Sequence, residues 1–199
     1  TFAMDLPWEK LDVVTWSWQK ALGGEGAHGM LALSPRAVER LQSYKPSWPL
    51  PKIFQLTKDG KLIDGIFVGE TINTPSLLAV EDCLDALKWV ESLGENGTGN
   101  WRATQARSKA NFEVMSQWIQ KTDWVKFLCD DAAARSRTSI CMKVSDPWFT
   151  AFDEDTRKSI IKDMVGLLDK EGVAYDIASY ASAPAGLRVW AGATIEKSD

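Results

Sequence analysis

The sequence predicts a mixed α/β fold in two parts, an α/β part and a compact α+β unit joined by a glycine-rich linker. Short β-branched runs typical of buried strands alternate with segments that carry apolar residues at helical spacing. The linker is the run 94–100, Gly-Glu-Asn-Gly-Thr-Gly-Asn. With 45% hydrophobic and 25% charged residues among 199, the composition is that of an ordinary globular protein.

Two strands and a helix are predicted before the first proline-rich loop. The run 11–16 is short, apolar and β-branched, and residues 30–33 form a second strand-like run. Pro35 is expected to open a helix that extends through Leu41. Three prolines within residues 46–51 favour an extended loop.

A longer helix is predicted over residues 76–93. Thr74 before Pro75 matches an N-cap residue followed by a proline in the first helical position. Five apolar residues fall on one helical face and are expected to point into the core: Leu77, Val80, Leu84, Leu87 and Val90.

Beyond the linker, the pattern predicts the α+β unit. Helices are expected at 101–121 and 153–170, and strands around 140–144, at 173–177 and at 187–190. Three apolar residues of the first helix are expected to face inward: Phe112, Met115 and Ile119. Ile140, Met142 and Val144 alternate with polar residues, as in a strand that is exposed on one face.

Charge and rare residues exclude several classes of function. The net charge is −4, which implies no basic face for nucleic acid. No apolar run approaches the roughly 18 residues of a membrane helix, and no leader is evident, so we expect a soluble, cytoplasmic protein. The three cysteines form no C-x-x-C and are expected to be reduced core residues. Because His28 is the single histidine, no metal site is predicted.

Two short motifs are coincidental. Gly24, Gly26 and Gly29 match the dinucleotide fingerprint G-x-G-x-x-G, but a strand rather than a helix follows them. Ser17 and Lys20 match the S-x-x-K of serine β-lactamases, but no K-T-G follows.

Lys20 is the residue with the greatest chemical interest. It follows the end of an apolar strand and precedes a glycine cluster, 23–29. A solvated loop lysine is the simpler interpretation. The functional one is an amine held in a cleft above a sheet, where it acts as a nucleophile toward an aldehyde while glycines let the backbone approach a flat cofactor. That is the chemistry of a pyridoxal-phosphate Schiff base.

Five segments resemble, in order, phosphoserine aminotransferases, a branch of the class V, fold-type I pyridoxal-phosphate enzymes: 17–29, 34–41, 48–54, 69–75 and 186–190. Since such enzymes are nearly twice as long, the resemblance implies their C-terminal portion. Residues 1–97 would form the end of the large α/β cofactor-binding domain. Residues 98–199 would form the smaller α+β domain, truncated at its end.

The resemblance also implies roles for individual residues. Lys20 forms the Schiff base with pyridoxal 5'-phosphate and then shuttles the proton, and Gln19 binds the cofactor phosphate. Asn73 and Thr74 reach the cofactor phosphate of the neighbouring subunit, so a homodimer with shared sites is expected. Arg188 holds the substrate α-carboxylate through its planar guanidinium.

The implied reaction is amino transfer between glutamate and 3-phosphohydroxypyruvate, giving phosphoserine and 2-oxoglutarate in L-serine biosynthesis. Many members of the family carry a His-Arg pair before the carboxylate-binding arginine, but loop 180–186 has no cation. The substrate phosphate could then be held by His28, by a cation of the other subunit, or by residues outside this chain. The alternatives are another class V aminotransferase with a different substrate, or a non-catalytic dimerisation fragment. The chain alone is expected to be inactive.

Overall fold

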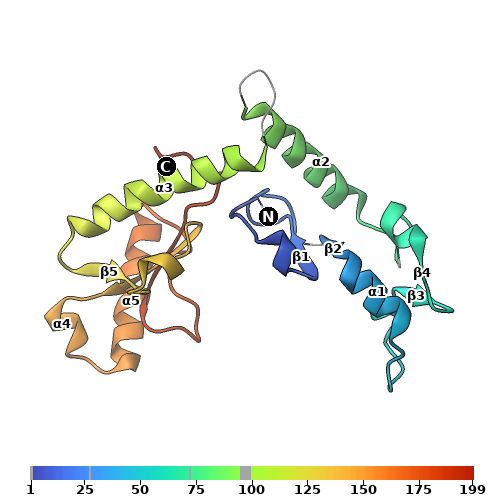
Figure 1. The fold of residues 1–199 in the computed structure, drawn as a ribbon. Helices are drawn as coiled ribbons and strands as arrows, with labels where there is room; N and C mark the ends of the chain where they lie inside the picture. The colour runs from blue at the N-terminus through green and yellow to red at the C-terminus, as the bar shows by residue number, and fades with distance from the viewer. Residues whose placement is uncertain (1, 27, 72, 95–99) are drawn as a thin grey trace.

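The computed structural model describes residues 2–26, 28–71, 73–94 and 100–199 (Figure 1). The elements before the linker are η1 (Trp8–Lys10), β1 (Val13–Ser17), β2 (Gly29–Leu33), α1 (Pro35–Ser43), η2 (Lys52–Phe54), β3 (Thr57–Lys58), β4 (Lys61–Leu62), η3 (Asp64–Val68) and α2 (Leu77–Ser92). Those after it are α3 (Trp101–Gln120), β5 (Val125–Phe127), η5 (Ala132–Ala134), β6 (Ser139–Val144), α4 (Pro147–Thr150), α5 (Glu154–Lys170) and β7 (Gly186–Trp190). The predicted domain boundary at 97/98 lies outside the described residues.

The two predicted strands form as β1 and β2, and they pair as an antiparallel hairpin, in register from Val13 opposite Leu33 to Ser17 opposite Gly29. A Cβ at Gly29 would lie 2.6 Å from the Trp16 carbonyl oxygen, so only glycine fits this close strand contact. The long turn between the strands carries Lys20.

Helix α1 begins where predicted and is attached to β1 by a polar network. Ser34 caps the helix by accepting a hydrogen bond from the Ala37 amide, and its hydroxyl donates to Asp12. Arg36 donates to both oxygens of the Asp12 carboxylate at 2.8 Å. The hydrogen bonds from Arg36 and Ser34 hold the pKa of Asp12 below its ordinary value.

Asp12→Asn is expected to lower stability at pH 7 and to have less effect at pH 3. Because the pKa is lowered in the folded state, the carboxylate contributes stability above its ordinary pKa of about 4, and this contribution is lost as the pH falls through the folded pKa. Urea unfolding midpoints of wild type, Asp12→Asn and the control Asp163→Asn at both pH values test this. An equal difference at pH 3 and pH 7 would show that the charge of Asp12 contributes nothing.

Helix α2 forms over nearly the predicted range, but two details were wrong. Its N-cap is Ser76, which accepts from the Ala79 amide, and Thr74 and Pro75 lie ahead of the helix. The buried face consists of small residues and one valine: Ala79, Cys83, Ala86 and Val90. Leu77 and Leu84 are 75% and 44% exposed. The small side chains let α2 pack closely against Trp18 and Leu22 of the β1–β2 turn.

The unit after the linker is an antiparallel sheet in the order β5-β6-β7 with α3 and α5 against it (Figure 1). Ile140 and Met142 are buried, whereas Cys141 between them is exposed, which confirms the predicted alternation. The sheet core packs against residues of both helices, including Ile119 and Ile161. No helix among the described residues is long and apolar enough to span a membrane.

Two predictions need correction, and one strand of this unit was missed. The predicted strand 173–177 does not form, because Asp176 adopts a left-handed backbone with φ of 50°. Instead Ala178 bridges Leu187 of β7. The short strand β5 was not predicted. Of the cysteines, Cys83 is buried and its pKa is raised by burial, but Cys141 is exposed, so the cysteines are not all core residues.

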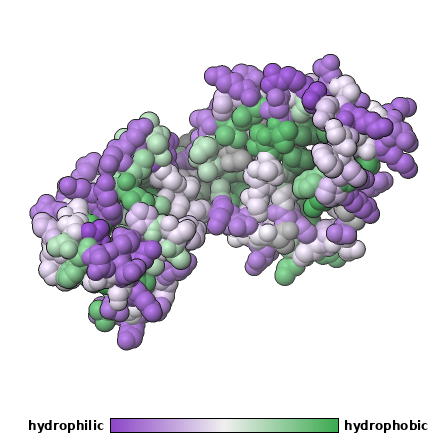
Figure 2. Space-filling view, turned by 90° about the horizontal axis from the view of Figure 1, so that it is seen from below, coloured by the Kyte–Doolittle hydropathy of each residue, from purple (hydrophilic) through white to green (hydrophobic). Residues whose placement is uncertain are grey.

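The chain exposes 13966 Å². A compact monomer of 22.1 kDa exposes about 9,300 Å². On the part before the linker, hydrophobic residues gather on one face (Figure 2). The most exposed large apolar side chains of this part are those of Trp48, Ile53, Phe54, Val68, Leu77 and Leu78. Such a surface is typical of a region covered by further polypeptide.

Candidate active site around Lys20

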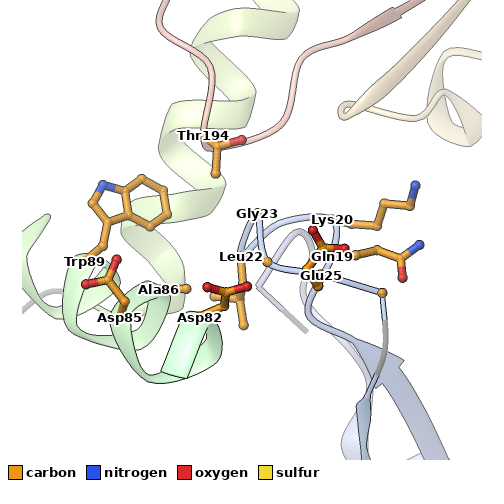
Figure 3. A pocket seen from close by; sticks show the side chains of 12 residues that line it. Gln19, Lys20, Leu22, Gly23, Glu25, Asp82, Asp85, Ala86, Trp89 and Thr194 are labelled. Atoms are coloured by element: carbon orange, nitrogen blue, oxygen red, sulfur yellow. The ribbon is translucent and has the colours of Figure 1, made fainter. Parts of the chain in front are cut away.

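Lys20 lies on the turn that follows β1, and two buried neighbours fix this turn. Trp18 and Leu22 insert into the cluster on α2, while Gln19 and Lys20 remain exposed. The amides of Gly23 and Gly24 donate to the carbonyls of Lys20 and Trp18, closing the turn. Figure 3 shows both exposed side chains extending in one direction, away from Trp89 of α2. The buried anchors therefore present the Lys20 amine outward.

Two cavities flank this turn. One, of about 600 Å³, lies between the turn and α2 and is lined by Gln19 and Lys20 together with three carboxylates, those of Glu25, Asp82 and Asp85 (Figure 3). The other, of about 330 Å³, is lined by Gln19, Lys20, Trp190 and Thr138 together with mostly apolar residues. The amine of Lys20 lies 5.9 Å from the centre of the Trp190 ring. Lys20 and Trp190, which are 170 positions apart in the sequence, therefore both line the second cavity.

The indole of Trp190 is held in place by the segment that follows β7. A Cβ at Gly192 would lie 2.3 Å from Cζ2 of that indole, so the ring lies directly on the glycine. The buried Asn111 of α3 donates to the carbonyls of Gly192 and Ile195 at 3.1 and 2.9 Å. Helix α3 therefore fixes the backbone on which the indole rests.

Gly192→Ala is expected to displace the Trp190 indole and to destabilise the protein by about 1–3 kcal/mol, the usual cost of overpacking a buried site. Denaturant unfolding followed by tryptophan fluorescence measures both effects. The matched control is Gly166→Ala in α5, where an added Cβ meets nothing within 4 Å. A Gly192→Ala variant as stable as wild type would contradict this packing.

Arg188 precedes Trp190 by two positions on β7, so both side chains lie on the same face of the strand. Its side chain is only 16% exposed. The guanidinium carbon lies 4.5 Å from the centre of the Tyr180 ring, and one nitrogen lies 3.4 Å from the Asp176 carboxylate. Strand β7 thus carries both the predicted carboxylate-binding arginine and Trp190, the residue whose ring lies beside the Lys20 amine.

Gln19 and His28 are tied to their own surroundings. The amide oxygen of Gln19 accepts from the Ser17 hydroxyl at 3.1 Å and would collide with a Cβ at Gly26. His28 packs edge-on against Trp18, and its Nε2 accepts from the Ser76 amide at 2.8 Å. That bond leaves only Nδ1 of His28 for any ligand.

Asn73 and Thr74 are exposed and do not line either cavity beside Lys20. They lie on the loop before α2, which the His28–Ser76 bond connects to the Lys20 turn. Their predicted contact with a neighbouring subunit stays a prediction. Trp190 and Thr138 were not predicted as site residues. The sequence feature that points to Trp190 is its position two residues after Arg188, which places both side chains on the same face of a strand.

Comparisons with known proteins relate the chain to one group of enzymes. No family model matches the chain. Phosphoserine aminotransferases of Methanosarcina barkeri and Methanosarcina mazei are each 54% identical to it over 198 residues, covering 100% of the chain and 50% of the relative. The chain thus spans about half the length of the curated relatives it matches.

Solved structures give the same relation at the level of fold. A phosphoserine aminotransferase from Cytophaga hutchinsonii superposes with a TM-score of 0.70 at 17% identity, over 96% of this chain and 47% of that one. A pyridoxal-phosphate-bound phosphoserine aminotransferase from Trichomonas vaginalis gives a TM-score of 0.69 at 17% identity, over 99% of this chain and 48% of that one. The predicted resemblance and mixed α/β fold class are confirmed: the chain is similar to the C-terminal portion of phosphoserine aminotransferases and has its fold.

Proposed function

We propose that this chain supplies the lysine-bearing part of a phosphoserine aminotransferase, which transfers an amino group between glutamate and 3-phosphohydroxypyruvate. The observation that carries the proposal is the position of the Lys20 amine, which is exposed beside a cavity and lies 5.9 Å from the ring of Trp190. Arg188 occupies the same strand as that ring. An amine that reacts with an aldehyde and a guanidinium that pairs with a carboxylate suit an amino acid substrate, which carries a carboxylate beside its reacting carbon.

The residues around Lys20 fit pyridoxal phosphate. Among the described residues that line the 330 Å³ cavity, Lys20 carries the one amine, the nucleophile that an aldehyde requires. Gln19, next to it, offers an amide to a phosphate, and the lack of a side chain at Gly26 leaves room for that amide. When bound, the cofactor supplies an electron sink that stabilises negative charge on the substrate Cα.

Each residue then has a defined task. The Lys20 amine anchors the cofactor and, once released, holds and returns the proton of the substrate Cα. Arg188 binds and orients the substrate carboxylate. Asn73 and Thr74, on their exposed loop, contact the cofactor phosphate of a neighbouring subunit, so the active protein is a homodimer with shared sites. His28 contributes to the substrate phosphate through Nδ1.

The exposed apolar surface before the linker supports a requirement for further polypeptide. Residues that are apolar and largely exposed, such as Trp48 and Val68, are typical of a face that another segment covers. We therefore propose that the chain alone is inactive. The curated relatives are about twice as long, which supports this requirement. Because the chain is similar to these phosphoserine aminotransferases, we also assign the reaction to L-serine biosynthesis in the cytoplasm.

Two features favour the alternative functions, which are a class V aminotransferase with a different substrate and a non-catalytic dimerisation fragment. Loop 180–186 carries no cation for a substrate phosphate, which favours another amino acceptor on the same fold. The apolar surface alone is also consistent with a dimerisation module that has no activity.

The test is to co-express the chain with the half of the Methanosarcina barkeri relative that it does not match. The assembled protein is expected to form 2-oxoglutarate from glutamate when 3-phosphohydroxypyruvate is added. Faster turnover with glyoxylate or pyruvate would reassign the substrate. A stable assembly that binds cofactor but transfers to none of the three acceptors would contradict aminotransferase function.

A further inference from the structure

The guanidinium of Arg188 lies between two residues of the segment that connects α5 to β7. Its carbon is 4.5 Å from the centre of the Tyr180 ring, so the aromatic face covers one side of the group. One terminal nitrogen is 3.4 Å from the carboxylate of Asp176. The Nε atom is fully buried and has no partner among the described residues. A carboxylate of the protein thus already lies at the arginine that is proposed to bind a substrate carboxylate.

The connecting segment is held firmly in this position. The Arg188 amide donates to the Ile177 carbonyl at 2.7 Å, and the Ser179 amide donates to the Gly186 carbonyl at 3.1 Å. At the far end, the Ala185 amide donates to the Glu154 carboxylate at the start of α5. Backbone bonds on both sides therefore fix where residues 176 and 180 lie relative to Arg188.

The contact of Asp176 with the arginine is weak and readily reversed. Asp176 is 93% exposed, so its carboxylate can turn into water without a large desolvation cost. It engages one guanidinium nitrogen at 3.4 Å, whereas an optimal carboxylate pair uses two nitrogens at 2.7–2.9 Å. Its left-handed backbone, φ 50°, is a conformation that aspartate and asparagine adopt more readily than most residues.

We propose that Asp176 is a placeholder carboxylate, which occupies Arg188 when substrate is absent and is displaced by the substrate carboxylate. This rests on the proposed function, in which Arg188 binds that carboxylate. A largely buried guanidinium is costly to leave without an anion, so Asp176 stabilises the unliganded site. Because Asp176 occupies the Arg188 guanidinium, it also competes with the substrate carboxylate for that group. Asp176 takes no part in bond making or breaking.

The direction in which the affinity for a carboxylate ligand changes distinguishes two roles for Asp176. If Asp176 competes, Asp176→Asn should tighten the binding of a carboxylate ligand, by about two- to five-fold for an exposed ion pair. If Asp176 serves only to orient Arg188, the same substitution should weaken binding. Asparagine keeps the size of the side chain and tolerates the left-handed backbone.

The experiment is calorimetric titration of the assembled protein, in which the chain is co-expressed with the half of the Methanosarcina barkeri relative that it does not match, with glutarate, a dicarboxylate without a keto or amino group to react with Lys20. Asp176→Asn is compared with Glu171→Gln, which removes the same charge from an exposed neighbouring position. Tightening in Asp176→Asn with no change in Glu171→Gln supports the proposal. Equal tightening in both variants would show a general effect of net charge and overturn it.

Arg188→Gln separates this inference from the proposed function. If Arg188→Gln removes glutarate binding while Asp176→Asn leaves it equal or weaker, Arg188 keeps its role and the placeholder proposal is overturned. If Arg188→Gln binds glutarate as wild type does, or if no chain binds it, the carboxylate role of Arg188 fails and the placeholder proposal fails with it.

Discussion

Lys20→Ala is expected to abolish covalent capture of pyridoxal phosphate and to slow amino transfer in the assembled enzyme by more than about 100-fold, the contribution typical of a positioned acid–base group. The substitution removes the one amine that the described residues place at the 330 Å³ cavity. It leaves the buried anchors of the turn, Trp18 and Leu22, in place. Stability should therefore be close to that of wild type, since Lys20 is exposed.

The measurement is visible absorbance of bound cofactor together with the rate of 2-oxoglutarate formation, with thermal unfolding as the check on folding. Lys52→Ala, another exposed lysine before the linker, is the control and should behave as wild type. Retention of cofactor absorbance and turnover in Lys20→Ala would show that a different amine performs the chemistry.

Arg188→Lys is expected to raise the KM for glutamate by about 10- to 100-fold, in line with charged hydrogen bonds of about 1.5–3 kcal/mol. Lysine keeps the positive charge but lacks the planar fork that pairs with both carboxylate oxygens. It also loses the flat contact with Tyr180. Steady-state kinetics on the assembled enzyme, at varied glutamate, test this.

The effect should fall on KM more than on kcat, because Arg188 lies on the strand two residues from Trp190 rather than at the reacting amine. Tyr180→Phe serves as the control, since phenylalanine keeps the aromatic face and should leave KM within about two-fold of wild type. An unchanged KM in Arg188→Lys would exclude a bidentate contact with substrate.

Local sequence patterns predicted the elements whose burial follows a simple period. The alternation of Ile140 and Met142 with exposed residues identified β6, and the apolar spacing in α3 placed Ile119 in the core. On α2 the prediction was right for Val90, which is buried, and wrong for Leu77 and Leu84, which are exposed while alanines and Cys83 pack inward. Periodicity reports apolar positions, and it does not report which neighbour they meet.

The errors between α5 and β7 have a different cause. Val173 and Ile177 favour a strand by propensity, but the left-handed backbone at Asp176 interrupts it. That conformation depends on the tertiary bonds of Arg188 and Ser179. No local pattern contains this information.

The site could be predicted only in part for the same reason. Lys20 was found from its place between a strand and a glycine cluster, and Arg188 from the resemblance. The proximity of Lys20 to Trp190 arises because α3 holds the segment after β7, through Asn111, beside the Lys20 turn. Contacts across 170 residues of sequence have no local signature.

Whether the Lys20 amine captures the cofactor is tested most directly by incubating the 199-residue chain with pyridoxal phosphate, reducing it with borohydride and mapping the modified peptides by mass spectrometry. We expect a phosphopyridoxyl adduct that is confined to Lys20 and lost in Lys20→Ala. Labelling scattered over the exposed lysines, or an adduct at a single different lysine, would contradict it.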